Sequence, residues 1–165
     1  MLGGLTAKHI AMTGRLGAAR RSARNANHIK RDGATEMMIQ RFNSGHVVPA
    51  VVPFPEGVRV GHMLYLSGQL GNVPGQMKLV EGGLRAETRQ TLENIRTVLR
   101  GQGLGLEHLV RCTVMLADMA DWPAFNEVYR EVFGTTPMPA RSALGCNGLA
   151  LGARVEIECI AAAPD

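Results

Sequence analysis

The stretch Leu109-Val-Arg-Cys-Thr-Val-Met-Leu116 has a clear period of two along its length. Alternate positions hold Val, Cys, Val and Leu, and the positions between them hold Arg, Thr and Met. Successive side chains of a strand point to opposite faces of a sheet, so this stretch predicts a β-strand. The segments on either side of it have a different period, and the combination decides the fold class.

A helix is predicted before this strand. Apolar residues between Leu84 and Leu99 recur at helical spacing, while Arg and Glu occupy the other face. Gly101 and Gly103 end the pattern, as is common at the C-terminus of a helix.

A second helix is predicted after the strand. Asp121 is expected to cap this helix through its carboxylate, with Pro123 in the first turn and Gly134 at the end. The helix is expected to turn an apolar stripe toward the core. The stripe comprises Trp122, Phe125, Val128, Tyr129, Val132 and Phe133.

Shorter extended segments complete the pattern. Strands are predicted at residues 39–42, 57–61, 63–67, 140–146 and 154–162. Ser67-Gly68 is expected to form a turn. This order of strands and helices predicts a single α+β domain in which two helices cover one face of a mixed sheet. The other face still carries apolar groups, and we expect it to pack against other subunits.

Length and composition narrow the class of protein. The 165 residues, 45% of them hydrophobic, suit one domain with a real core. No apolar run approaches the roughly 18 residues of a membrane span, so no membrane partner is expected. The cysteines, Cys112, Cys146 and Cys159, lack the spacing of a disulfide framework or a zinc site. We expect buried thiols, which fit a reducing compartment such as the cytoplasm.

The formal net charge of +4 is unevenly distributed: residues 1–37 carry +5 and residues 38–165 carry −1. We therefore separate a basic N-terminal extension or leader, 1–37, from a domain, 38–165. Three interpretations of the extension stay open: a disordered tail or upstream extension of the coding frame, a mitochondrial transit peptide, and a functional basic arm. The nearly neutral domain offers little attraction for phosphates, so nucleic acid is not the expected partner.

Few chemical motifs are present. The chain contains neither a GxxxxGK[ST] phosphate loop nor an HExxH metal motif. Lys78, the one lysine after residue 37, lies in a turn region and is a poor candidate for a Schiff base. In Pro137-Met-Pro-Ala-Arg-Ser142, Arg141 opens a strand after a stiff turn. Its planar guanidinium could hold a carboxylate through two hydrogen bonds, and pairing with a surface acid is an equal alternative.

Residues from about 38 to 163 resemble the RidA (YjgF) family of reactive-intermediate deaminases. Each matching block is weak alone, and the order and spacing of the blocks carry the resemblance. The blocks are Ser67-Gly-Gln69, Gln90-Thr-Leu-Glu-Asn94, Val110-Arg-Cys-Thr-Val-Met-Leu116, Asp118-Met-Ala-Asp121, Phe125-Asn-Glu-Val-Tyr129, Pro139-Ala-Arg-Ser142 and Val155-Glu-Ile-Glu-Cys-Ile-Ala161.

The resemblance implies a chorismate-mutase-like fold, a homotrimer with clefts between subunits, and no cofactor or metal. It also implies an enzyme of the 2-iminobutanoate/2-iminopropanoate deaminase type, which hydrolyses 2-imino or enamine acids to 2-keto acids and ammonia. Two alternatives stay open. One is a non-catalytic trimeric module that binds a small carboxylate and regulates a partner, and the other is an RNA-cleaving relative.

The same resemblance assigns roles to individual residues. It implies that Arg141 holds the substrate carboxylate and that Glu156 positions the attacking water. The alternative interpretation of Glu156 is that it is an ordinary strand residue on the solvated face of the sheet. Ser67 matches the family's serine at the edge of the pocket, and Asn126 matches a pocket asparagine.

Two pocket positions depart from the family pattern. Phe54 stands where many deaminases have a tyrosine, and Ala143 stands where many have a cysteine. The missing phenol removes a possible hydrogen-bond donor to the substrate or the water. We expect these changes to affect rate and substrate range more than the fold.

Overall fold

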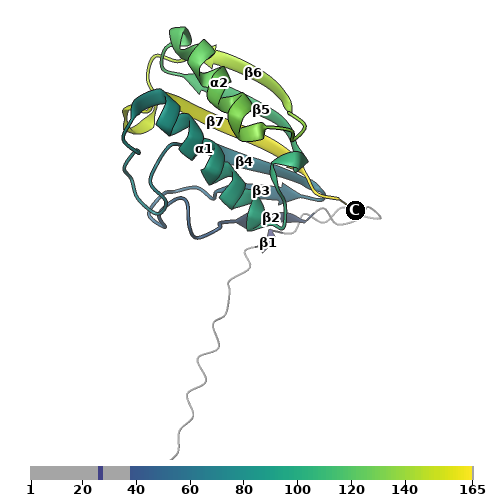
Figure 1. The fold of residues 1–165 in the computed structure, drawn as a ribbon. Coiled ribbons are helices and arrows are strands. Elements are labelled where there is room, and N and C mark those ends of the chain that lie inside the picture. Colours follow the sequence, from purple (N-terminus) through teal and green to yellow (C-terminus); the bar gives the residue numbers. More distant parts are fainter. Residues whose placement is uncertain (1–25, 28–37, 165) are drawn as a thin grey trace, which may run out of the picture.

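The computed structural model describes residues 26–27 and 38–164 (Figure 1). Its main elements are β1 (Ala26–Asn27), β2 (Ile39–Phe42), β3 (Gly57–Val60), β4 (Met63–Leu70), α1 (Gly83–Arg100), β5 (Leu109–Leu116), α2 (Trp122–Phe133), β6 (Ala140–Gly145) and β7 (Val155–Ala162). Apart from Ala26–Asn27, which pair with β2, the N-terminal extension lies outside the described residues, as do the interpretations offered for it.

Within the described ranges the strands form one sheet in the order β1-β2-β3-β4-β7-β5-β6. Of the strands that the structure describes, only β5 and β6 pair in parallel, and α2 is the crossover that such a connection needs. Both helices lie across the same face of the sheet (Figure 1). The α+β prediction is therefore confirmed. We call the face opposite the helices the open face.

Local patterns predicted most element bounds, and two details of the strands were wrong. Ser67-Gly68 is no turn: both residues belong to β4, at a register shift between Leu66 and Gln69. Val110 belongs to the apolar positions of β5, yet it is 47% exposed, because the register also shifts between Leu109 and Arg111. Such irregularities depend on the neighbouring strand, so the sequence of one strand does not reveal them.

The start of α2 also differs from the prediction. Asp121 makes no side-chain cap; its carboxylate accepts two hydrogen bonds from Arg154, at 3.0 and 2.6 Å. Trp122 is 43% exposed and does not join the core stripe. The preceding short 3₁₀ turn is capped instead by Asp118, which accepts the N–H of Ala120 at 2.8 Å.

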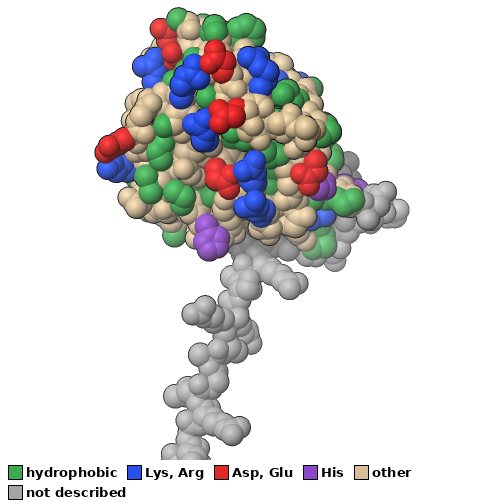
Figure 2. Space-filling model, in the orientation of Figure 1, with side chains coloured by type: hydrophobic (Ala, Val, Ile, Leu, Met, Phe, Trp, Pro, Cys, Tyr) green, Lys and Arg blue, Asp and Glu red, His purple; other side chains and the backbone are tan. Residues whose placement is uncertain are grey.

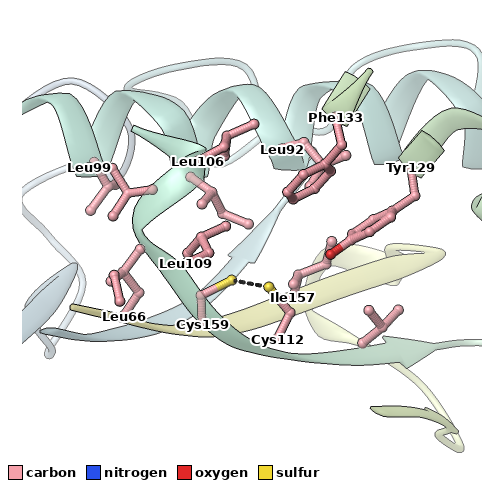
Figure 3. Close-up of a cluster of buried hydrophobic side chains, with 14 of the residues drawn as sticks. Leu66, Leu92, Leu99, Leu106, Leu109, Cys112, Tyr129, Phe133, Ile157 and Cys159 are labelled. Carbon is pink, nitrogen blue, oxygen red and sulfur yellow. Dashed lines mark hydrogen bonds between the residues drawn. The ribbon is translucent and has the colours of Figure 1, made fainter. Parts of the chain in front are cut away.

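The core lies between the helices and the sheet. Figure 3 shows Leu92 and Leu99 from α1 and Tyr129 and Phe133 from α2 above the strands. The buried face predicted for the last strand is confirmed: Val155, Ile157, Cys159 and Ala161 are at most 3% exposed. Cys112 is buried as expected, whereas Cys146 is only partly buried.

The outer surface of the helices is charged. Arg85 pairs with Glu127 at 2.5 Å, and Arg89 pairs with Glu131 at 2.7 Å, so both pairs join α1 to α2. Figure 2 shows basic and acidic side chains interspersed over this side of the molecule. Among the described residues, no helix is long and apolar enough to cross a membrane.

Candidate active site

Arg141 lies at the end of a row of residues that crosses the sheet. Leu66 of β4 pairs with Cys159 of β7, Cys159 with Cys112 of β5, and Cys112 with Arg141 of β6. Directly opposed residues share a face, and the first three members of the row are buried beneath the helices. Arg141 therefore lies on the helix-covered face. Its strand, β6, forms one edge of the sheet.

The guanidinium of Arg141 is held by three residues of α2. Its Cζ lies 4.6 Å from the ring centroid of Tyr129 and 5.3 Å from that of Phe125. One of its N–H groups donates to Asn126 Oδ1 at 2.6 Å. Residues four apart lie on one side of a helix, so Phe125 and Tyr129 form a continuous aromatic platform, with Asn126 beside it. The orientation of the guanidinium is thus set by packing as well as by a hydrogen bond.

Arg141 has donors to spare. A guanidinium carries five N–H donors, and within the described part of the chain no carboxylate pairs with this one. The surface-acid alternative is therefore not realised in this structure. A partly exposed arginine with a fixed plane and free donors is suited to a planar anion such as a carboxylate.

Ala143 lies two residues beyond Arg141 and packs against the same core. Its register partner is the buried Val114, which places the methyl group on the helix-covered face. Ala143 therefore lies on the same face as Arg141, whose guanidinium contacts Asn126. We call them, with the aromatic platform, the arginine half-site.

Glu156 lies on the opposite face. It pairs with Leu70 of β4 and Met115 of β5, and its neighbours Val155 and Ile157 point into the core. A Cβ at Gly68 would overlap Glu156 Oε1, so the carboxylate lies directly over the backbone of that glycine. A side chain at this position would displace the carboxylate of Glu156 from where it lies.

The environment of Glu156 favours its protonated form. Burial, and then the like charge of Glu158 on the same face, raise the pKa of its carboxyl above the ordinary 4.5. Among the described residues it has neither a hydrogen-bond donor nor a cationic partner. An unpaired, partly buried carboxylate with a raised pKa is typical of catalytic acids and bases.

Ser67 precedes Gly68 in β4, and Phe54 precedes Pro55, which Ser67 contacts. Ser67 Oγ donates to the carbonyl of Pro55 at 2.8 Å, and Ser67 N–H donates to the carbonyl of Glu56 at 2.9 Å. Phe54 precedes these residues and is 47% exposed. The serine hydroxyl is thus used as a donor within the chain and retains only acceptor capacity. We call Glu156, Gly68, Ser67 and Phe54 the glutamate half-site.

The two half-sites do not meet within one chain. Arg141 shares its face with Cys112, whereas Glu156 shares its face with Met115 and, through Met115, with Leu144 of β6. The sheet lies between the guanidinium and the carboxylate. The residues assigned to one pocket are therefore divided between two surfaces of the chain.

Some contributors could not be identified from sequence. Tyr129 and Phe125 were expected only as core residues, and their second role depends on where β6 lies. Glu56 is fully buried, and its carboxylate accepts the backbone N–H groups of Ser44 and Val48. In the sequence, the one feature that could have drawn attention to Glu56 is its position between Pro55 and an apolar strand. Among the described residues, no group of three or more His, Cys, Asp or Glu side chains is arranged to hold a metal ion.

Comparison with known proteins identifies close relatives. The family model described as Endoribonuclease L-PSP matches residues 45–163. A goat protein named 2-iminobutanoate/2-iminopropanoate deaminase is 40% identical over 125 residues, which cover 75% of this chain and 90% of the goat protein.

Solved structures agree. RidA from the Antarctic bacterium Psychrobacter is 36% identical with a TM-score of 0.69, over 74% of this chain and 98% of that one. TdcF of E. coli, solved with bound serine, is 27% identical with a TM-score of 0.70, over 76% of this chain and 99% of that one.

Proposed function

Because the chain belongs to the RidA (YjgF) family, we propose that it hydrolyses 2-imino acids, or their enamine tautomers, to 2-keto acids and ammonia. The observation that supports this best is Arg141, whose guanidinium is fixed by Tyr129 and Asn126 and has no acid partner among the described residues. Relatives named as 2-iminobutanoate/2-iminopropanoate deaminases support the reaction class. The serine bound to TdcF also carries a carboxylate next to a nitrogen-bearing carbon.

The reaction needs a positioned carboxylate and a base. Arg141 binds the substrate carboxylate through two N–H groups and so fixes the imine carbon, C2. Glu156 accepts a proton from a water as its oxygen bonds to C2, and the π electrons of the C=N bond pass to the nitrogen, which takes a proton. The carbinolamine nitrogen then takes one more proton, the hydroxyl gives up its proton as the C=O bond forms, and the C–N bond breaks so that ammonia leaves. A base of this kind contributes about 10²–10⁴-fold to a rate.

Both half-sites must serve one substrate, so we propose that a second copy completes the site. β6 is an edge strand, and Arg141 can therefore face the open face of a neighbouring subunit. Two features of the open face suit a subunit contact: Tyr65 is 46% exposed, and a hollow of about 320 Å³ is lined by Tyr65, Arg111 and Glu158 among others. A homotrimer closed in this way would contain three equal clefts.

A coupled assay tests the activity. An amino acid oxidase generates 2-iminopropanoate from alanine, semicarbazide traps the imine, and the protein is added. We expect faster release of pyruvate and less trapped imine. Arg141→Ala should abolish most of this effect, whereas Arg89→Ala, which removes an exposed arginine of α1, should not. Wild-type protein that accelerates no imine overturns the proposal, and full activity of Arg141→Ala overturns the role of Arg141.

A carboxylate-binding module without turnover is the second candidate. It is favoured by Phe54 and Ala143, which offer no polar groups, and by Ser67, whose hydroxyl already donates to Pro55. This candidate predicts that pyruvate binds by calorimetry in an Arg141-dependent manner while no imine is hydrolysed. Acceleration of imine hydrolysis excludes it.

A further inference from the structure

Cys112 and Cys159 form a pair of thiols in the middle of the sheet. They lie directly opposite each other on the antiparallel strands β5 and β7, and their Sγ atoms are 3.1 Å apart (Figure 3). Both side chains are buried, at 0% and 3% exposure. Directly opposed strand residues have Cβ atoms about 4.5–5.5 Å apart, and a disulfide needs about 3.5–4.5 Å. A bond between these sulfurs therefore requires only a small local movement.

The pair is chemically asymmetric. The hydrogen bond with Cys159 lowers the pKa of the Cys112 thiol, against the effect of burial, and the charge of Arg141 acts in the same direction. The same hydrogen bond, together with burial, raises the pKa of Cys159. Cys112 is thus the better nucleophile of the two, and Cys159 is placed to attack any oxidised sulfur on it.

The thiols lie directly beneath the support of Arg141. Cys112 is the register partner of Arg141, and Tyr129 points from α2 toward the sheet beside Cys112 (Figure 3). The Tyr129 hydroxyl is buried and lies close enough to the Cys112 thiol to lower the pKa of that thiol, although no contact of this hydroxyl within the described residues has the geometry of a full hydrogen bond. A displaced sulfur at Cys112 would therefore move the surface on which the guanidinium rests.

We propose that Cys112 and Cys159 are a redox modification site, which hydrogen peroxide converts into a reversible intrachain disulfide that displaces the support of Arg141. The Cys112 thiolate attacks one peroxide oxygen and becomes a sulfenic acid as hydroxide leaves. Cys159 sulfur then attacks Cys112 sulfur, the S–O bond breaks, and a second water forms. Overall, two thiols and one peroxide give one disulfide and two waters. Because both sulfurs are buried, peroxide enters during local opening of the core, and the reaction is slow.

The test uses the full chain with Cys146→Ser, which removes the partly exposed thiol and leaves the buried pair. The protein is incubated with peroxide in native buffer, catalase ends the reaction, and free thiols are alkylated in denaturant. We expect both thiols to disappear together, a mass loss of about 2 Da, and a peptide that links residues 112 and 159. Dithiothreitol should restore both thiols.

Two matched variants separate the disulfide from simple oxidation. Cys112→Ser and Cys159→Ser, each in the Cys146→Ser background, retain one buried thiol and should gain oxygen, about 16 Da per atom, or stay unchanged. The proposal is overturned if the pair gains oxygen in place of losing 2 Da. It is equally overturned if both thiols stay free after an incubation many times longer than the one that fully oxidises Cys146 in the wild-type protein.

The effect on Arg141 is a second readout, and it rests on the proposed function, whereas the mass measurement does not. The oxidised protein should show a KM for 2-iminopropanoate that is raised about threefold or more, reversed by dithiothreitol, because displacements near 1 Å weaken positioning strongly. A disulfide that forms with KM unchanged would contradict the link to Arg141. Absence of activity in both redox forms would contradict the proposed function and leave the disulfide to be judged by mass.

Discussion

The orientation of one guanidinium is the central feature of the site at the scale of residues. Arg141 is placed by Tyr129, Phe125 and Asn126, and none of these contacts neutralises its charge. Glu156 is the converse case: a carboxylate with no partner among the described residues, partly buried next to a second acid. Neither group is neutralised within the described residues. We therefore expect the guanidinium of Arg141 to bind an external anion and the carboxylate of Glu156 to accept a proton.

Replacement of Tyr129 tests the platform. Tyr129→Leu removes the ring under the guanidinium, a contact worth about 0.5–2 kcal/mol, so we expect KM to rise roughly three- to thirty-fold with a smaller change in kcat. Tyr129→Phe keeps the ring and removes a hydroxyl that makes no full hydrogen bond within the described residues, so KM should stay within about twofold. Steady-state kinetics with 2-iminopropanoate measure both.

Leu99→Ala is the control for lost stability. Leu99 is fully buried in α1, and its truncation should cost about 2–5 kcal/mol of unfolding free energy without raising KM. If Leu99→Ala raises KM as much as Tyr129→Leu, the platform has no specific role.

The protonation of Glu156 predicts a pH dependence. If the ionised carboxylate is the base, kcat/KM should fall as pH falls through its pKa, which burial and Glu158 hold above 4.5. Glu158→Gln removes the like charge and should shift this acidic limb to lower pH. If the acidic limb of the pH profile is the same in Glu158→Gln as in the wild type, the group that titrates is not Glu156.

The free energy of unfolding should also depend on the titration of Glu156. In contrast to kcat/KM, it should fall as the carboxyl ionises. A carboxyl whose pKa is raised on folding stabilises the fold when protonated, and this contribution is lost as pH rises through the folded-state pKa. Glu156→Gln should therefore raise the free energy of unfolding at pH 7 more than at pH 4, as measured by urea titration. An equal change at both pH values would contradict the raised pKa.

At the scale of elements, the loop between β2 and β3 depends on one buried acid. Glu56 Oε1 accepts Val48 N–H at 3.0 Å and Oε2 accepts Ser44 N–H, while Asn43 Oδ1 accepts the N–H of Glu56 at 2.7 Å. Its carbonyl accepts Ser67 N–H, which ties the loop to β4. The loop carrying Phe54 is thereby held against the glutamate half-site.

Glu56→Gln should loosen this loop. The amide presents an NH₂ group where a backbone N–H needs an acceptor, so we expect a loss of about 1–3 kcal/mol and faster amide exchange across residues 43–56. Glu81→Gln is the matched control, because its side chain is 92% exposed and only its pair with Lys78 is lost. Equal exchange rates in the two variants would show that Glu56 does not hold the loop.

At the scale of the whole molecule, the open face is predicted to be a subunit interface. Tyr65 lies in a row with Val58, Ile160 and Arg111, which spans four strands of this face. Tyr65→Glu places a charge at its centre and should convert a trimer to folded monomers without deaminase activity, as measured by light scattering, circular dichroism and kinetics. Met77→Glu alters an apolar side chain of comparable exposure outside this face, at 55%, and should leave assembly and activity unchanged. An assembled, active Tyr65→Glu protein would contradict this interface.

Much of the fold could be predicted because its signals are local. The period of two in residues 109–116 predicted β5 with its observed bounds, and helical spacing predicted α1 and α2. Asp121 was misjudged because its carboxylate binds Arg154, 33 residues away, and a distant partner leaves no local trace. Trp122 was misjudged because periodicity does not say where a helix stops facing the core.

The sequence by itself determined which elements form and, through family resemblance, which residues to examine. Register alone decided how these residues are arranged, because side chains in a strand alternate between faces. It places Arg141 beside Cys112 and the α2 aromatics, and Glu156 on the open face with Met115. Pairing between strands distant in the chain is a tertiary property. For that reason only the folded structure revealed the division of the site, the aromatic platform and the thiol pair beneath it.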